Sequence, residues 1–180
     1  MKKVLFSLIL LLMFCGCKNN SVVNVIKSDY ESLNDKYLKV TIPDNKIEKI
    51  DYYQFEEVKK NVGALYFCLP TSNYCRNNIE VFVELYNDLE LNNIYYIDLS
   101  NKDDGYKNFI KEYNKDEDIK YGDVIIFGEG KIIDKLSLDK IVEPEEKLSE
   151  EEKKNEYKRL YDFLVQLNDP DICDRDSDGC

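Results

Sequence analysis

The feature that most constrains the fold is a six-residue apolar run, Gly63-Ala-Leu-Tyr-Phe-Cys68. Its apolar residues do not alternate with polar ones, which indicates a strand buried on both faces in the centre of a parallel sheet. Residues 69–73, Leu-Pro-Thr-Ser-Asn, have turn and N-cap chemistry, and an amphipathic helix should follow them. The apolar face of that helix consists of Ile79, Phe82, Val83, Tyr86 and Leu89.

The segment before this run should supply one strand and one helix. Residues 37–42 are predicted to form a first strand, which ends at the turn sequence Pro43-Asp44-Asn45. Asp51 and Gln54 have the spacing of a capping box, which predicts a short helix to about residue 61.

The segment after it should supply three strands and two helices. Residues 93–100 predict a second buried strand, followed by an amphipathic helix, and residues 124–127 and 131–134 predict a hairpin around a Gly-Glu-Gly turn. Ser149 and Glu152 form another capping box, which opens a last helix. The inward residues of the first of these helices are Tyr106, Phe109, Ile110 and Tyr113, and those of the last are Tyr157, Leu160, Tyr161, Leu164 and Leu167.

The predicted order is β-α-β-α-β-α-β-β-α, with helical connections in the first half and a hairpin in the second. We therefore predict a three-layer α/β/α domain over residues 37–168, with a mixed sheet of four to five strands.

The N-terminus has the pattern of an export signal. Two lysines precede an apolar stretch from Val4 to Phe14, which is too short to cross a bilayer core of ~30 Å, and Gly16-Cys17 follows. This segment resembles the signal of bacterial lipoproteins, although Phe14 is bulkier than the usual aliphatic residue. The resemblance implies that residues 1–16 are removed and that Cys17 receives the lipid. The alternative is an uncleaved signal anchor. Residues 17–36, polar and rich in Asn and Ser, are predicted to be a tether on the outer face of the cell membrane.

Composition excludes several functions. Histidine is absent, which excludes Ser-His-Asp and Cys-His catalysis and every imidazole metal site. The formal charge of −11 disfavours nucleic acid and anionic lipid surfaces as partners.

Four cysteines remain outside the signal and Cys17, namely Cys68, Cys75, Cys173 and Cys180. In an exported protein an even number favours disulfides, and Cys68–Cys75 with Cys173–Cys180 is the simplest pairing. The sequence does not choose among the three connectivities. A zinc site with four cysteine ligands is the alternative, although no C-x2-C knuckle is present.

Residues 65–76, Leu-Tyr-Phe-Cys-Leu-Pro-Thr-Ser-Asn-Tyr-Cys-Arg, are similar to the strand-to-helix active-site segment of thioredoxin-like proteins, especially the bacteriocin-transport accessory group. The similarity extends through the hairpin and covers most of residues 50–168. It implies a thioredoxin-like fold and a site with two thiols three positions apart, of which the first is partly thiolate.

The chain departs from this pattern at three positions. Ser72 replaces the nucleophilic cysteine, so only Cys75 remains, at the resolving position. Residues 121–123, Tyr-Gly-Asp, replace the family's cis-proline stretch, and a cis bond without proline costs about 2.5 to 4 kcal/mol. Tyr66 stands where the family has a buried acid, and a tyrosine is not a base at neutral pH. Cys68, at the end of the strand, is within reach of Cys75 and offers either a relocated redox pair or a static bridge.

The C-terminal residues 169–180 form an acidic segment bounded by cysteine. Asp174, Asp176, Asp178 and Gly179 match the first half of a D-x-D-x-D-G calcium loop, but the second half is missing. An acidic tail tied by a disulfide is the simpler interpretation, and no cofactor other than calcium is suggested.

Three hypotheses follow. The first is a lipid-anchored thioredoxin-like lipoprotein that serves as a binding or accessory module for an unknown protein partner. The second is a thiol-disulfide oxidoreductase that uses Cys75 with Cys68 on a thiol substrate. The third is a calcium-binding surface scaffold that uses the tail.

Overall fold

The computed structural model describes residues 24–100, 104–113, 120–137, 144–169 and 171–172. A five-stranded sheet in the order β1-β3-β2-β4-β5 forms its centre. Strands β1, β3 and β2 are parallel, whereas β4 runs antiparallel to β2 and pairs with β5 in the hairpin. The strands are β1 (Glu48–Lys49), β2 (Gly63–Cys68), β3 (Ile94–Asp98), β4 (Val124–Gly128) and β5 (Lys131–Leu136).

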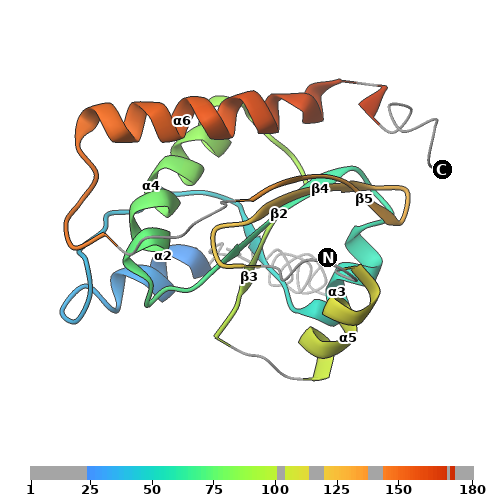
Figure 1. The fold of residues 1–180 in the computed structure, drawn as a ribbon, viewed down its shortest axis with the longest axis horizontal. Coiled ribbons are helices and arrows are strands. Elements are labelled where there is room, and N and C mark those ends of the chain that lie inside the picture. Colours follow the sequence, from blue (N-terminus) through green and yellow to red (C-terminus); the bar gives the residue numbers. More distant parts are fainter. Residues whose placement is uncertain (1–23, 101–103, 114–119, 138–143, 170, 173–180) are drawn as a thin grey trace, which may run out of the picture.

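Helices cover both faces of this sheet (Figure 1). On one face lie α2 (Val25–Glu31), α4 (Asn73–Asp88) and α6 (Glu150–Leu164), which share one apolar core. On the other face lie α3 (Tyr52–Val58) and α5 (Asp104–Tyr113), which share a second core. The predicted three-layer α/β/α domain with a mixed sheet of four to five strands is therefore confirmed.

Local sequence signals place the ends of several elements correctly. Strand β2 spans the predicted residues, and all six are buried. Both capping boxes are present: the Asp51 carboxylate accepts from the N–H of Gln54, and the Ser149 hydroxyl accepts from that of Glu152. Such caps satisfy backbone N–H groups that have no partner inside the helix.

The apolar stripe predicted for the last helix is only partly correct. Leu160 and Leu164 are buried against α4, but Tyr161 has 38% of its surface exposed. Its ring stacks on Tyr157, one turn earlier, with 6.4 Å between ring centroids. Tyr161 therefore covers the outer side of a neighbouring ring instead of entering the core.

The predicted tether is wrong in its second half. Residues 25–31 form helix α2, and the side chains of Ile26 and Tyr30 are fully buried in the core beside α4. The charged residues between them are half-buried and pair with other segments, Lys27 with Asp44 and Asp29 with Lys49, and these charges hide the helical period in the sequence. The part of the chain that the structure describes begins at residue 24, and residues 17–23 of the predicted tether lie outside it.

The strand predicted at residues 37–42 is absent as well. Val40 and Ile42 are buried as expected, but the backbone of this segment bonds to side chains rather than to a neighbouring strand. The Asn34 side chain pairs with both the N–H and the carbonyl of Val40 at 2.9 Å. The N–H of Ile42 donates to Glu31 at 2.9 Å. The edge strand of the sheet is β1 instead.

None of the helices in the described ranges is long and apolar enough to cross a bilayer.

Candidate functional site

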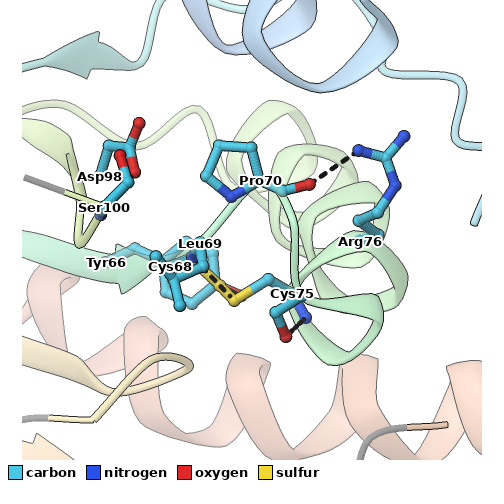
Figure 2. The surroundings of a disulfide bond; sticks show 9 residues. Tyr66, Cys68, Leu69, Pro70, Cys75, Arg76, Asp98 and Ser100 are labelled. Carbon is cyan, nitrogen blue, oxygen red and sulfur yellow. Dashed lines mark hydrogen bonds between the residues drawn. A yellow bond between two sulfur atoms is a disulfide. The ribbon is translucent and has the colours of Figure 1, made fainter. Parts of the chain in front are cut away.

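A disulfide joins the end of the central strand to the start of the helix that follows it. Cys68 is the last residue of β2 and Cys75 the third residue of α4, and their Cα atoms lie 5.8 Å apart (Figure 2). The turn over residues 69–72 reverses the chain within this distance. Since both sulfurs are in the bridge, they are not available as thiolate ligands, and the alternative of a four-cysteine zinc site is wrong.

The bridge is enclosed by protein. Cys68 and Cys75 each have 0% of their surface exposed. The backbone N–H of Leu69 donates to Cys75 Sγ at 3.1 Å. The Tyr66 hydroxyl lies 3.1 Å from Cys68 Sγ, and because a bridged sulfur carries no hydrogen, the hydroxyl is the donor. Both sulfurs therefore have internal hydrogen-bond partners.

Tyr66 has no role as a proton acceptor at neutral pH. Burial raises the pKa of its phenol well above the ordinary value, so the group stays protonated. Its ring stacks on Phe82 of α4, with 4.5 Å between centroids. Tyr66 is therefore a neutral packing residue that donates to the disulfide.

Ser72, which the sequence analysis compared with a nucleophilic cysteine, acts as the N-cap of α4. Its hydroxyl accepts from the N–H of Cys75 at 3.2 Å, and only 7% of the residue is exposed. A serine at an N-cap satisfies an orphan backbone donor, which is a structural task.

Residues 121–123, which the sequence analysis compared with a cis-proline stretch, contain a glycine in a left-handed backbone conformation. Gly122 has a positive φ of 92°, and its N–H donates to the Phe67 carbonyl at 2.6 Å. The ring of Tyr74 lies directly against its Cα, where any Cβ would clash. No cis peptide bond occurs in the described part of the chain, as predicted. Tyr74, the neighbour of Cys75, thus packs on Gly122, whose N–H bonds to the residue before Cys68.

Arg76 is a site residue that the sequence analysis did not single out, although it lies inside the motif. Its side chain is fully buried and donates to the carbonyls of Pro70 at 2.8 Å and Tyr30 at 2.9 Å (Figure 2 shows the first). It also donates to the Leu38 carbonyl and, at 2.6 Å, to Asn34 Oδ1. Burial lowers the pKa of the guanidinium, which nonetheless stays charged at neutral pH.

This arginine connects the disulfide turn to the N-terminal segment. Its acceptors lie on the turn and on residues 30–38, and its guanidinium packs over the Tyr30 ring at 5.8 Å. An arginine on a helix is normally exposed. The burial of Arg76 therefore follows only from tertiary packing.

Several predicted site residues lie outside the described residues. These are the lipid-attachment residue Cys17, the second cysteine pair Cys173–Cys180, and the calcium candidates Asp174, Asp176 and Asp178. In the part of the chain that the structure covers, no group of three or more acidic or cysteine side chains is arranged to hold a metal ion.

Comparison with known proteins adds little to this geometry. No protein-family model matches the chain, and a search of curated proteins finds no match. Among solved structures, the chain is similar to one described as human ERp44, form II, at 14% identity and a TM-score of 0.42. The match covers 71% of this chain and 32% of that one, so the chain spans about a third of its length.

Proposed function

We propose that this protein is a lipid-anchored binding or accessory module on the outer face of the cell membrane, and that Cys68–Cys75 is a structural bridge in it. The observation that carries the proposal is the complete burial of both cysteines. Thiol-disulfide exchange requires a thiolate to reach one sulfur of the bridge, and neither sulfur is accessible from the surface in this fold.

The groups around the bridge support the same function. A redox site of this fold needs an exposed cysteine at the start of the helix, and Ser72 stands there as a cap. A site for thiol substrates also needs open space beside the disulfide, whereas both cysteines are fully buried and Tyr74, the neighbour of Cys75, packs against Gly122. In this proposal the turn between β2 and α4 is kept, while the exposed cysteine and the open space that turnover requires are replaced by Ser72 and Tyr74.

The location of the protein rests on its N-terminal sequence. The lysines, the short apolar stretch and Gly16-Cys17 favour export and attachment of a lipid at Cys17. A disulfide within the domain is consistent with an oxidising compartment outside the cytosol. The partner in this proposal is another protein at the membrane surface.

A redox titration tests the structural role of the bridge. The folded protein is equilibrated in dithiol buffers of known potential, and its thiols are alkylated and counted by mass spectrometry. We expect the bridge to stay oxidised until the potential falls below about −300 mV, as structural disulfides do. Reversible reduction at a higher potential, together with reduction of insulin, would establish the oxidoreductase instead.

The Ser72→Cys variant is the matched control for this titration. It restores two cysteines three positions apart, with the first at the helix N-terminus, where a thiolate is favoured. We expect this variant to exchange with dithiols in the range where the wild-type bridge does not.

Fractionation tests the lipid anchor. The wild-type protein should incorporate a labelled fatty acid and sediment with membranes, whereas a Cys17→Ser variant should do neither. Unlabelled wild-type protein in the soluble cell fraction would refute the anchor without affecting the redox result.

A further inference from the structure

A cavity of about 730 Å³ lies where α4 ends, beside the N-terminus of α2. It is lined by Asn24, which is the N-cap of α2, by Asn45, and by Tyr86 and Leu91 from the end of α4 and the segment after it. The volume falls within the ~300 to 1,000 Å³ of small-molecule pockets. This α2–α4 cavity is at the end of α4 opposite to the disulfide turn, so a ligand in it leaves the bridge untouched.

Hydrogen bonds hold the wall of the α2–α4 cavity in place. Asn45 has 8% of its surface exposed, and its side-chain amide donates to Asn24 Oδ1 and to the Pro43 carbonyl, each at 3.1 Å. Asn87, in the last turn of α4, donates to the Asp44 carbonyl at 3.2 Å. The cavity is therefore formed before any ligand binds, which lowers the entropic cost of binding.

Glu90 lines this cavity from an unfavourable backbone position. Its φ is 49°, and it ends α4 in a Schellman motif, in which the N–H of Leu91 donates to the Tyr86 carbonyl at 3.3 Å. Glycine is the usual residue there, because a Cβ is unfavourable at positive φ. A carboxylate at the negative end of a helix adds a second cost, and the last turn of α4 contains no basic residue to offset it. The local structure therefore does not account for a glutamate at this position.

The polar groups that line the cavity include both donors and acceptors. The side chains of Glu90, Asn92 and Lys46 line it, and no described residue forms an ion pair or hydrogen bond with any of these side chains. A carboxylate accepts hydrogen bonds, an ammonium donates them, and a carboxamide does both. A ligand that matches these side chains must itself both donate and accept.

The charges around the cavity favour a neutral ligand. Asp44 is paired with Lys27 at 3.0 Å, which leaves one carboxylate, that of Glu90, and one ammonium, that of Lys46. An anion is opposed by the first and a cation by the second. The hydroxyls of a saccharide are neutral and both donate and accept, and the apolar face of a sugar ring matches the half-buried ring of Tyr86.

We propose that the α2–α4 cavity binds a neutral saccharide, whose hydroxyls donate to the Glu90 carboxylate and accept from Lys46 and Asn92. Hydrogen bonds to a charged acceptor are stronger than neutral ones, and they offset the local costs of Glu90. Saccharide binding goes beyond the proposed function, since it uses neither the disulfide turn nor a protein partner.

NMR titration of the intact folded protein tests the proposal. The probes are methyl glucoside and N-acetylglucosamine, with triglycine as a zwitterion of comparable size. We expect both sugars to shift the side-chain amide signals of Asn87 and Asn92, with dissociation constants of about 1 to 10 mM, and to bind at least about fivefold more tightly than triglycine. The absence of shifts at these residues, or tighter binding of triglycine, would overturn the proposal.

Two glutamates with positive φ supply matched variants. Glu90→Gly relieves the backbone and removes the carboxylate, so it should raise the melting temperature by about 2 to 4 °C and weaken sugar binding at least about tenfold. Glu129 has a φ of 52° and is exposed in the turn between β4 and β5, away from the cavity. Glu129→Gly should raise the melting temperature in the same way and leave sugar binding unchanged. Wild-type affinity in the Glu90→Gly variant, or an equal loss in both variants, would overturn the proposal.

Discussion

Replacement of Arg76 by alanine should be among the most destabilising single changes in this protein. The guanidinium donates to four acceptors: the carbonyls of Tyr30, Leu38 and Pro70, and Asn34 Oδ1. None of these residues carries a charge, so the charged guanidinium is stabilised by the dipoles of carbonyl and amide groups.

The loss of stability can be estimated from the acceptors that the substitution leaves without a donor. Each buried acceptor that loses its donor costs about 1 to 3 kcal/mol. The lower end applies, because the Tyr30 carbonyl also accepts from Leu33 and Asn34 Oδ1 also accepts from Val40. The cavity left by the side chain adds to the loss, and the relief of a desolvated charge subtracts from it. We expect a loss of about 4 kcal/mol, a large share of the ~5 to 15 kcal/mol of a typical domain.

Urea unfolding and hydrogen exchange measure this effect. Arg76→Lys keeps the charge but not the planar fork of donors, and should lose about half as much. Lys60→Ala, which removes only an exposed ion pair to Glu57, should change the free energy of unfolding by less than about 1 kcal/mol. Exchange should accelerate over residues 24–42 in the Arg76→Ala variant. A loss below about 1 kcal/mol, or unchanged protection of that segment, would refute the reasoning.

Three further changes have directions that the structure determines. Replacing Cys68 and Cys75 together by alanine opens an eight-residue loop and should lower the free energy of unfolding by about 2.5 kcal/mol in denaturant titrations; no change would refute a structural bridge. Gly122→Ala should lower the melting temperature, because φ is positive and the new Cβ meets the Tyr74 ring; an unchanged melting temperature would contradict that packing. Burial raises the pKa of Asp123, so its ionisation removes stability as pH rises above about 4, and Asp123→Asn should gain stability over the wild type between pH 3 and pH 7; a difference that is constant with pH would show that the pKa is not raised.

The parts of the fold that the sequence predicted well depend on neighbours a few residues apart. The capping boxes at Asp51 and Ser149 join atoms three positions apart, and the same is true of the Ser72 cap. Strand β2 was predictable because it has no polar residues on either face, so neither face can be exposed to solvent. The Cys68–Cys75 pairing was predictable for a similar reason, since the two cysteines flank the short turn between β2 and α4.

Other features were decided only by contacts between distant segments. Residues 37–42 have the composition of a strand, but the side chains of Asn34 and Glu31 accept hydrogen bonds from their backbone N–H groups in place of a neighbouring strand. The sequence of α2 reads as a polar tether because the burial of Tyr30 depends on Arg76 and on the core of the domain. Sequence patterns report which residues prefer burial, whereas the partner that satisfies each backbone group depends on packing across the whole domain. The packing of Tyr74 against Gly122 has the same origin, because Tyr74 lies on α4 and Gly122 lies just before β4, which pairs with β2.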